Sequence, residues 1–175
     1  MTDSKDQPRE LSQYLTFILD SEEYGVPILK VNGIKGWEKT TPIPNSPSYV
    51  MGIINLRGEV VPIISLRKRF GLKDIELDAH TVVIVVRLEQ EDKTRTIGLV
   101  VDAVADVYDI KAEDLHSTPD FGKKISEDFV RGLGMINEKL VILLEIDNLV
   151  DWQKINEREA ELKETAQGDS AAIAA

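Results

Sequence analysis

Cysteine is absent from this chain of 175 residues, and histidine occurs only twice. Without cysteine the protein forms no disulfide, has no thiolate nucleophile and holds no cysteine-ligated metal, and a reducing cytoplasm is the expected compartment. His80 and His116 are far apart in sequence and do not form a pair at metal-ligand spacing. We therefore predict no metal site.

Long apolar runs and an excess of positive charge are also missing. The longest apolar stretches, such as residues 81–86, have the length of a strand, whereas a membrane-spanning helix needs about 20 apolar residues. Residues 1–13 are polar and lack the apolar core of a signal peptide. The formal net charge of −10 at pH 7 disfavours binding to nucleic acid or to an anionic membrane surface. We expect a cytoplasmic protein with no nucleic-acid partner and no direct membrane contact.

Short apolar runs rich in β-branched residues make up most of the remaining chain. Strands are predicted at residues 14–19, 24–31, 58–66, 81–88, 96–107 and 139–146. Several of these runs are apolar on both faces, which is typical of a small closed barrel or of strands between packed layers. Pro27 and Pro62 cannot donate a ladder hydrogen bond and therefore predict an edge, a bulge or a bend. The predicted fold class is all-β.

Short helical turns are expected at two places between the strands. Ser46 followed by Pro47 predicts a capped turn within residues 46–53. Residues 65–71 predict a second turn, because this segment ends in a glycine.

The two ends of the chain differ from the middle. Residues 1–13 are expected to form a flexible arm. Residues 146–165 are rich in Glu, Lys, Leu and Ala, and Trp152, Ile155 and Leu162 fall on roughly one helical face. We expect a helix there that packs over the core, so that residues 151–175 form a C-terminal helix and tail.

The chain also resembles itself. One alignment of the chain with itself places Gly25 on Gly98, and a second places Gly52 on Gly132, each followed by apolar residues in matching positions. Both halves contain an apolar strand, a strand led by glycine, and a glycine-led turn into a doubly apolar strand. This repeat predicts two similar β units, residues 14–80 and 81–150, packed side by side with exchange of a strand left open.

No enzyme motif is present. The chain has no phosphate-binding GxxxxGK[ST] loop and no G-x-S-x-G elbow, and residues 131–137 lack the third glycine of a dinucleotide-binding loop. A Ser-His-Asp arrangement assembled from distant positions stays open, but nothing in the sequence favours it. We predict a protein that is not an enzyme, with no catalytic and no cofactor-binding residues.

Three features suggest a binding surface, and each has a structural alternative. Val31 and Ile34 lie three residues apart around a glycine, where a bend could expose both, or else they are core residues. Phe121 stands in a loop of Pro, Asp, Gly and Lys and either fills a barrel or contacts a partner. Arg57 is the only charged residue in residues 48–58 and lies in a predicted turn, where it is either solvated or functional.

Four segments together resemble the CheW family of chemotaxis adaptors. They are "INLRGEVVPIISLRKRFG", with "YGVPILKV" before it and "TIGLVVDAVADV" and "GLGMINEKLVILLEI" after it, and the resemblance covers residues 14–150. It implies two five-stranded SH3-like β-barrels packed side by side. It also implies a non-enzymatic scaffold that joins the cytoplasmic tip of methyl-accepting chemoreceptors to the regulatory domain of the histidine kinase CheA. The protein would then be recruited to membrane-associated receptor arrays through these partners.

The resemblance also implies roles for individual residues. A receptor groove would be lined by Val31 and Ile34 on one side and by Val101, Val104 and Val107 on the other, with Arg57 at its rim. The kinase would be contacted by His116, Asp120 and Phe121.

The resemblance leaves two departures and two alternatives. Gly33 stands where an acidic residue is expected, which affects the charge of the receptor groove, and Ser65 replaces an aspartate in what is expected to be a local cap. One alternative is an adaptor of another chemosensory pathway, controlling pili, surface motility or a second messenger. The other is a small-ligand-binding β protein with a pocket in the seam, which predicts polar groups where the sequence supplies mainly Val and Ile.

Overall fold

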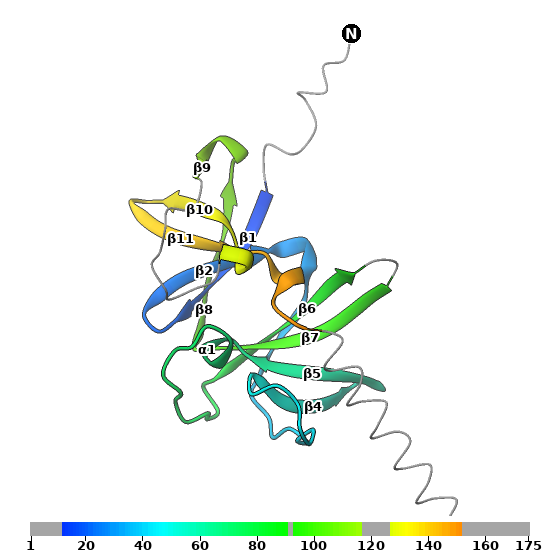
Figure 1. Ribbon diagram of the computed structural model, residues 1–175. Coiled ribbons are helices and arrows are strands. Elements are labelled where there is room, and N and C mark those ends of the chain that lie inside the picture. Colours follow the sequence, from blue (N-terminus) through cyan, green and yellow to red (C-terminus); the bar gives the residue numbers. More distant parts are fainter. Residues whose placement is uncertain (1–11, 91–92, 117–126, 152–175) are drawn as a thin grey trace, which may run out of the picture.

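The computed structural model describes residues 12–90, 93–116 and 127–151, and their strands form two sheets. The first sheet contains, in spatial order, β8 (Ala103–Ile110), β1 (Ser12–Leu19), β2 (Glu22–Pro27), β11 (Lys139–Leu144), β10 (Val130–Ile136) and β9 (Leu115–His116). The second contains β3 (Val31–Gly36), β6 (Val82–Gln90), β7 (Lys93–Val101), β5 (Glu59–Ser65) and β4 (Val50–Leu56). Figure 1 shows the first sheet in the upper part of the view and the second in the lower part. The predicted all-β fold class is confirmed.

Helices in the described residues are short. They are α1 (Leu66–Arg69) and the 3-10 helices η3 (Ile28–Lys30), η4 (Ala112–Asp114), η5 (Glu127–Phe129) and η6 (Ile146–Asn148). No helix in these parts of the chain is long and apolar enough to cross a membrane.

The sheets do not coincide with the two halves of the sequence. The chain leaves the first sheet after β2, passes through η3 into the second sheet, and returns at Asp102 between β7 and β8. The first sheet therefore combines residues 12–27 with residues 103–144, and a division of the barrels near residue 80 is wrong. Strands β1 and β2 belong with the later half because β2 pairs with β11. Strands β6 and β7 in turn lie with the strands of the earlier half.

The repeat itself is visible in the strand pairing. Strand β5 runs parallel to β7 with Ile63 opposite Gly98, and β11 runs parallel to β2 with Leu143 opposite Gly25. The two self-alignments superpose these pairs, Ile63 on Leu143 and Gly25 on Gly98. A Cβ atom at Gly98 would lie 2.6 Å from Ile63 Cδ1, and one at Gly25 would lie 2.9 Å from Leu143 Cδ2. Each glycine is therefore required by the aliphatic side chain on its parallel neighbour.

Most buried side chains form one cluster shared by the two sheets, with contributions such as Leu144 from the first and Leu99 from the second. Within it Phe17 stacks on Tyr24 with ring centroids 5.9 Å apart, and Tyr24 stacks on Phe70 at 5.7 Å. A smaller cluster lies within each sheet. Burial of each large apolar side chain contributes about 1.5–3 kcal/mol, so the shared cluster holds the two sheets together.

The helix predictions had mixed outcomes. Helix α1 is confirmed, and Ser65 caps it by accepting a hydrogen bond from the Lys68 N–H at 3.3 Å. A turn is present within residues 46–53, since the Val50 N–H donates to the Pro47 carbonyl at 2.9 Å, but it is not continued as a helix because the chain extends from Val50 and pairs with β5. The C-terminal helix does not begin at residue 146, since residues 146–148 form only η6 and residues 149–151 are not helical. Its remaining residues lie outside the described part of the chain.

Each of the two prolines has a ladder partner on only one side of its strand. Pro27 is the last residue of β2. Pro62 lies within β5, which pairs with β7 only from Ile63 onward. Both agree with the rule that proline avoids fully paired central positions.

Candidate functional site

Arg57 projects from a tight turn between β4 and β5. Its φ is 54° and that of Gly58 is 86°, so both central residues are left-handed, as in the two-residue turns that suit twisted hairpins. The Asn55 side-chain oxygen accepts a hydrogen bond from the Gly58 N–H at 2.8 Å, which fixes the turn. The Arg57 side chain is exposed at its tip.

A hollow of about 430 Å³, here called the Arg57 hollow, brings this turn together with β3. It is lined by Asn32, Gly33, Ile34, Lys35, Leu56, Arg57, Glu59, Val85 and Thr96. Ile34 and Arg57, distant in sequence, thus lie in one depression. Nothing lies within 4 Å of the Cβ position at Gly33, so the absent side chain leaves this part of the hollow uncovered.

The charges at the Arg57 hollow are mixed. Lys35 and Arg57 are opposed by Glu59, and Lys35 also forms an ion pair with Glu38 at 2.9 Å. Because Gly33 supplies no carboxylate, the lining itself holds two cations, Lys35 and Arg57, against the single carboxylate of Glu59. Such a surface favours a partner that brings carboxylates or backbone carbonyls.

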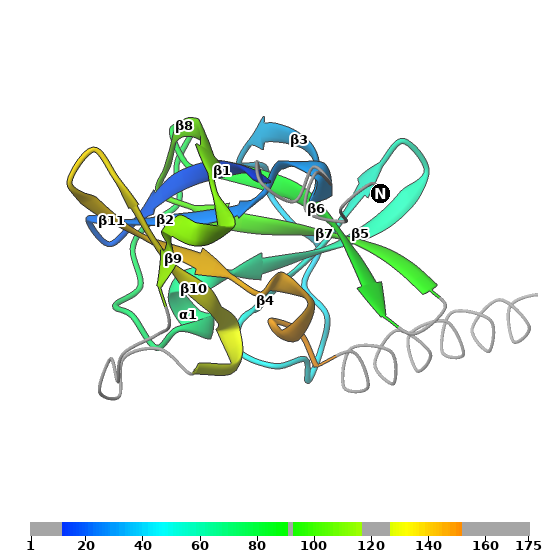
Figure 2. The same cartoon turned by 90° about the horizontal axis from the view of Figure 1, so that it is seen from above.

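Apolar side chains on β3 and β8 extend this surface. Ile34 is 50% exposed and Val107 is 43% exposed, whereas Val31 and Val104 are half-buried and pack against the shared core. Strands β3 and β8 are edges of the second and the first sheet, and Figure 2 shows them along the same side of the molecule with β1 between them. Val31, Val104 and Val107 do not line the Arg57 hollow itself.

The expected role of Val101 on this surface is wrong. Val101 is fully buried and belongs to the shared core. The sequence suggested one strand over residues 96–107, but β7 ends at Val101 and the chain bends at Asp102 into the other sheet. Val101 and Val104 therefore lie in different sheets, and only Val104 reaches the surface.

The expected kinase contacts are only partly described. His116 is exposed in β9, opposite Leu133 of β10. Asp120 and Phe121 lie outside the described residues.

Five exposed apolar residues were not predicted. They are Leu29 at 86% exposed, Val60 at 54%, Met135 at 53%, Leu140 at 47% and Ile75 at 41%. Leu29 follows Pro27 in η3, and its apolar neighbours gave no sign that this turn faces outward. Met135 and Leu140 lie opposite one another in the β10–β11 hairpin, on the face that carries buried Leu133 and Ile142. Alternation predicts that shared face, but it does not reveal where the core ends along it.

Tyr108 of β8 has a perturbed hydroxyl. Burial raises its pKa above the usual value, and the negative charges of Glu23 and Asp106 raise it further. Tyr108 therefore remains neutral at physiological pH.

The feature that the described residues offer for function is an exposed surface suited to binding a partner. In residues 12–90, 93–116 and 127–151 no group of three or more His, Cys, Asp or Glu residues could hold a metal ion. The fold and the site define a small β protein of two interleaved units, with an exposed surface that mixes apolar and charged side chains.

Comparisons with known proteins place this architecture in a family. The model of the CheW-like domain matches residues 13–154. The chemotaxis protein CheW of Klebsiella aerogenes is 39% identical over 143 residues, which are 82% of this chain and 84% of that protein. The chemotaxis protein CheW of Rhizobium meliloti is 36% identical over 148 residues, which are 85% of this chain and 91% of that protein.

A solved structure agrees with the sequence matches. The scaffolding protein TtCheW from Thermoanaerobacter tengcongensis superposes with a TM-score of 0.72 at 30% identity, over 81% of this chain and 88% of that one. The chain belongs to the CheW family, and the resemblance carried by its sequence motifs is confirmed.

Proposed function

We propose that the protein is a non-enzymatic adaptor that couples methyl-accepting chemoreceptors to a CheA-type histidine kinase. The observation that carries the proposal is the hollow that holds Ile34 and Arg57, beside a surface that also exposes Val107. The relatives support it, since their names describe chemotaxis proteins and a scaffolding protein. The contacts with the receptor and with the kinase involve binding only and no chemical reaction.

The receptor contact is a helix-in-groove interaction. The helical hairpin of the receptor tip lays its apolar stripe against Ile34 and Val107, while Val31 and Val104 support these contacts from the core side. Arg57 holds a carboxylate or backbone carbonyls of the tip. Its planar head donates several hydrogen bonds in a fixed geometry, which sets the register of the hairpin better than a lysine would.

The kinase contact uses other residues. His116, Asp120 and Phe121 form it, with Phe121 as the aromatic anchor. His116 lies on β9, whereas Val31 lies on β3 and Val104 and Val107 lie on β8. Receptor and kinase thus bind different parts of one small protein.

Coupling follows from this arrangement by linkage. If binding of one receptor state changes the free energy of kinase binding to the adaptor, kinase binding changes the free energy of binding that receptor state by the same amount. Each interface is small and weak by itself, and the many repeated contacts in an array supply avidity. Residues 14–150 form the binding domain, flanked by the arm 1–13 and by residues 151–175. The protein stays in the cytoplasm and reaches the membrane-associated array through its partners.

An isotope-edited NMR titration with a soluble chemoreceptor tip tests the receptor site. Signals of Val31, Ile34, Arg57, Val104 and Val107 should shift while the rest of the spectrum stays unchanged. Absence of shifts at millimolar tip, with the protein folded, would reject the proposed receptor contact.

Substitution of Arg57 tests its role in the same titration. Arg57→Ala should raise the Kd about tenfold, because a charge-assisted bidentate contact is worth roughly 1.4 kcal/mol or more. Lys139→Ala is the matched control, since Lys139 is an exposed cation next to the equivalent turn of the β10–β11 hairpin. Equal effects of the two substitutions would show that Arg57 acts only through net charge.

A further inference from the structure

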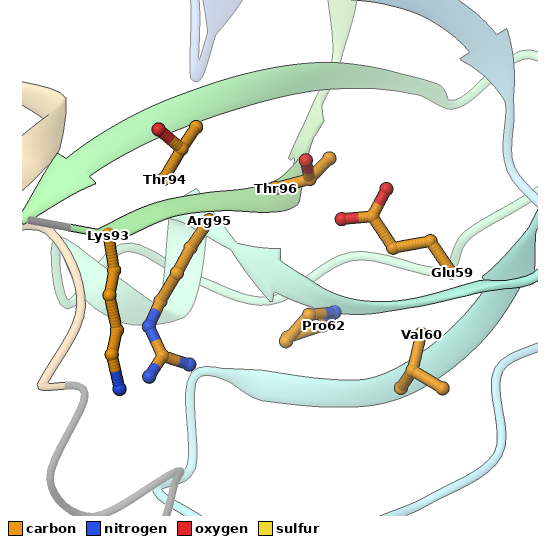
Figure 3. A pocket seen from close by; sticks show the side chains of 7 residues that line it. All are labelled: Glu59, Val60, Pro62, Lys93, Thr94, Arg95 and Thr96. Carbon is orange, nitrogen blue, oxygen red and sulfur yellow. The ribbon is translucent and has the colours of Figure 1, made fainter.

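Strands β5 and β7 diverge at one end, and a second depression lies between them. The two strands pair only where residues 63–65 face residues 98–100. Before that point a hollow of about 360 Å³, here called the Lys93 hollow, is lined by Glu59, Val60, Pro62, Lys93, Thr94, Arg95 and Thr96. Figure 3 shows these side chains, with Thr94 and Thr96 on the other side of β7 from Lys93 and Arg95.

The lining combines an apolar side with cations. Val60 is 54% exposed and supplies the exposed apolar part, whereas Pro62 beside it on the same strand is buried. Lys93 and Arg95 extend in the same direction from β7, as alternate residues of a strand do. Glu59 supplies the only carboxylate of the lining. An amphipathic segment with apolar and acidic side chains is the complementary occupant.

The described chain ends beside this hollow. The Glu89 N–H donates a hydrogen bond to Asp147 Oδ1 at 3.2 Å, and Glu89 lies directly opposite Thr94 of the lining. A few residues later, the Asp151 N–H donates to the Tyr49 hydroxyl at 3.1 Å. Residues 152–175 therefore continue from Asp151, which is bound to Tyr49 and follows shortly after the contact of Asp147 with the β6–β7 hairpin.

The sequence of this C-terminal segment fits the lining. Trp152, Ile155 and Leu162 fall on roughly one helical face. Four glutamates, Glu157, Glu159, Glu161 and Glu164, outnumber the three cations Lys154, Arg158 and Lys163. Fourteen helical residues span about 21 Å, which is sufficient to cross two or three neighbouring strands. Tethering raises the effective concentration to the millimolar range, so even a weak contact is populated.

We propose that residues 152–165 dock within the same molecule onto the Lys93 hollow. Their apolar side chains cover Val60, and their glutamates face Lys93 and Arg95. Glu59 and Thr96 line both this hollow and the Arg57 hollow, so the docked segment borders the candidate receptor surface. The docking is a property of the free protein and does not depend on any partner.

Paramagnetic NMR on the full chain tests the proposal. Because the protein has no cysteine, Ala160→Cys gives a single attachment point for a nitroxide. The amide signals of Val60, Thr94 and Thr96 should lose most of their intensity, and reduction of the nitroxide should restore it. Unchanged intensities at these three amides would overturn the proposal.

Charge reversal distinguishes docking from chance proximity. In the labelled protein, Lys93→Glu with Arg95→Glu should abolish most of the intensity loss. Lys111→Glu with Lys139→Glu changes the net charge equally at exposed positions away from the hollow and should leave the loss intact. Equal effects of the two pairs, or no effect of either, would contradict the proposed contact.

Mixing separates the same molecule from a second copy. Nitroxide-labelled protein without isotope is mixed with isotope-labelled protein without nitroxide. Intramolecular docking predicts no intensity loss in the mixture. A loss at Val60, Thr94 and Thr96 in the mixture would assign the hollow to the segment of another copy and overturn the intramolecular proposal.

Discussion

Arg67 donates two hydrogen bonds to Asp102, from Nε to Oδ1 at 2.9 Å and from Nη2 to Oδ2 at 2.6 Å. Asp102 is the residue at which the chain passes from the second sheet to the first. Its carboxylate also accepts the Asp20 N–H at 2.9 Å, and Arg67 donates to the Lys73 carbonyl at 2.7 Å. One ion pair therefore joins α1, the crossover and the β1–β2 turn.

The other crossover carries a counterpart with reversed charges. Lys30, in η3 between β2 and β3, pairs with Asp147 of η6 at 2.7 Å. The self-alignment that places Gly52 on Gly132 also places Arg67 on Asp147, and the other alignment places Lys30 on the residue after Asp102. Each crossover is thus clamped by the short helix that follows a repeated hairpin. The two clamps hold the relative position of the sheets, whose edges β3 and β8 flank the candidate receptor surface.

Asp102→Asn should destabilise the fold. The Arg67 side chain is 12% exposed and that of Asp102 22%, so removing the Asp102 charge leaves Arg67 partly buried with only the more distant carboxylate of Asp20, at 3.8 Å. We expect a loss of about 2 kcal/mol in the free energy of unfolding, between the values for exposed and buried pairs. Urea denaturation measures it. The control Lys35→Ala, which breaks a more exposed pair, should cost less than about 0.5 kcal/mol. Similar losses for both variants would refute the clamp.

The same pair predicts a pH dependence. Burial acts to raise the pKa of Asp102, but the hydrogen bonds from Arg67 and from the Asp20 N–H, with the charge of Arg67, lower it overall. A lowered folded-state pKa contributes stability that is present above the unfolded value of about 3.9 and lost as pH falls through the folded value. The difference in unfolding free energy between wild type and Asp102→Asn should be constant from neutral pH to about pH 5 and shrink below about pH 4. Denaturation curves over this range measure it, and a difference that grows toward low pH would contradict the assignment.

Gly98→Ala should disrupt the parallel pairing of β5 and β7. The new methyl group would lie 2.6 Å from Ile63 Cδ1 and 2.8 Å from Val83 Cγ1, so the core must shift. Overpacking of this kind costs about 1–3 kcal/mol. At Gly33 the same substitution meets nothing within 4 Å and should leave stability unchanged or raise it by less than about 1 kcal/mol. Thermal unfolding of the two variants separates close packing from a general effect of losing glycine.

The fold class was predictable because its signals are local. Short β-branched runs, glycine-led turns and the internal repeat describe strands and hairpins without reference to the rest of the chain. The assignment of strands to sheets was not predictable in this way, because it depends on β2 pairing with β11, far away in sequence. The turn expected from Ser46 and Pro47 ends at Val50 for a similar reason, since pairing with β5 extends the chain from there.

The candidate site shows the same limit. The sequence alone left Ile34 and Arg57 open between core, solvent and function, and the tertiary structure places them in one hollow. Val101 and Val104 shared an apolar pattern, but the bend at Asp102 buries the first and leaves the second at the surface. Leu29 gave no signal, because a 3-10 turn exposes one residue of an apolar run without changing its composition.

Ile34 and Val107 should contribute separately to receptor-tip binding if both edge strands flank one groove. Each serine substitution removes apolar contact at a half-exposed side chain and should raise the Kd several-fold, equivalent to about 1 kcal/mol. Because the residues lie on different sheets, the effects should add in the Ile34→Ser, Val107→Ser double variant. Calorimetric titration with the tip measures all three variants.

Leu140→Ser is the matched control for this pair, since Leu140 is 47% exposed but lies in β11. It should leave tip affinity unchanged, and none of the variants should lower the melting temperature appreciably. An effect at Ile34 without one at Val107 would reduce the receptor site to the Arg57 hollow and β3. An effect of equal size at Leu140 would show that the tip responds to exposed apolar surface in general, and the two-sided groove would then be wrong.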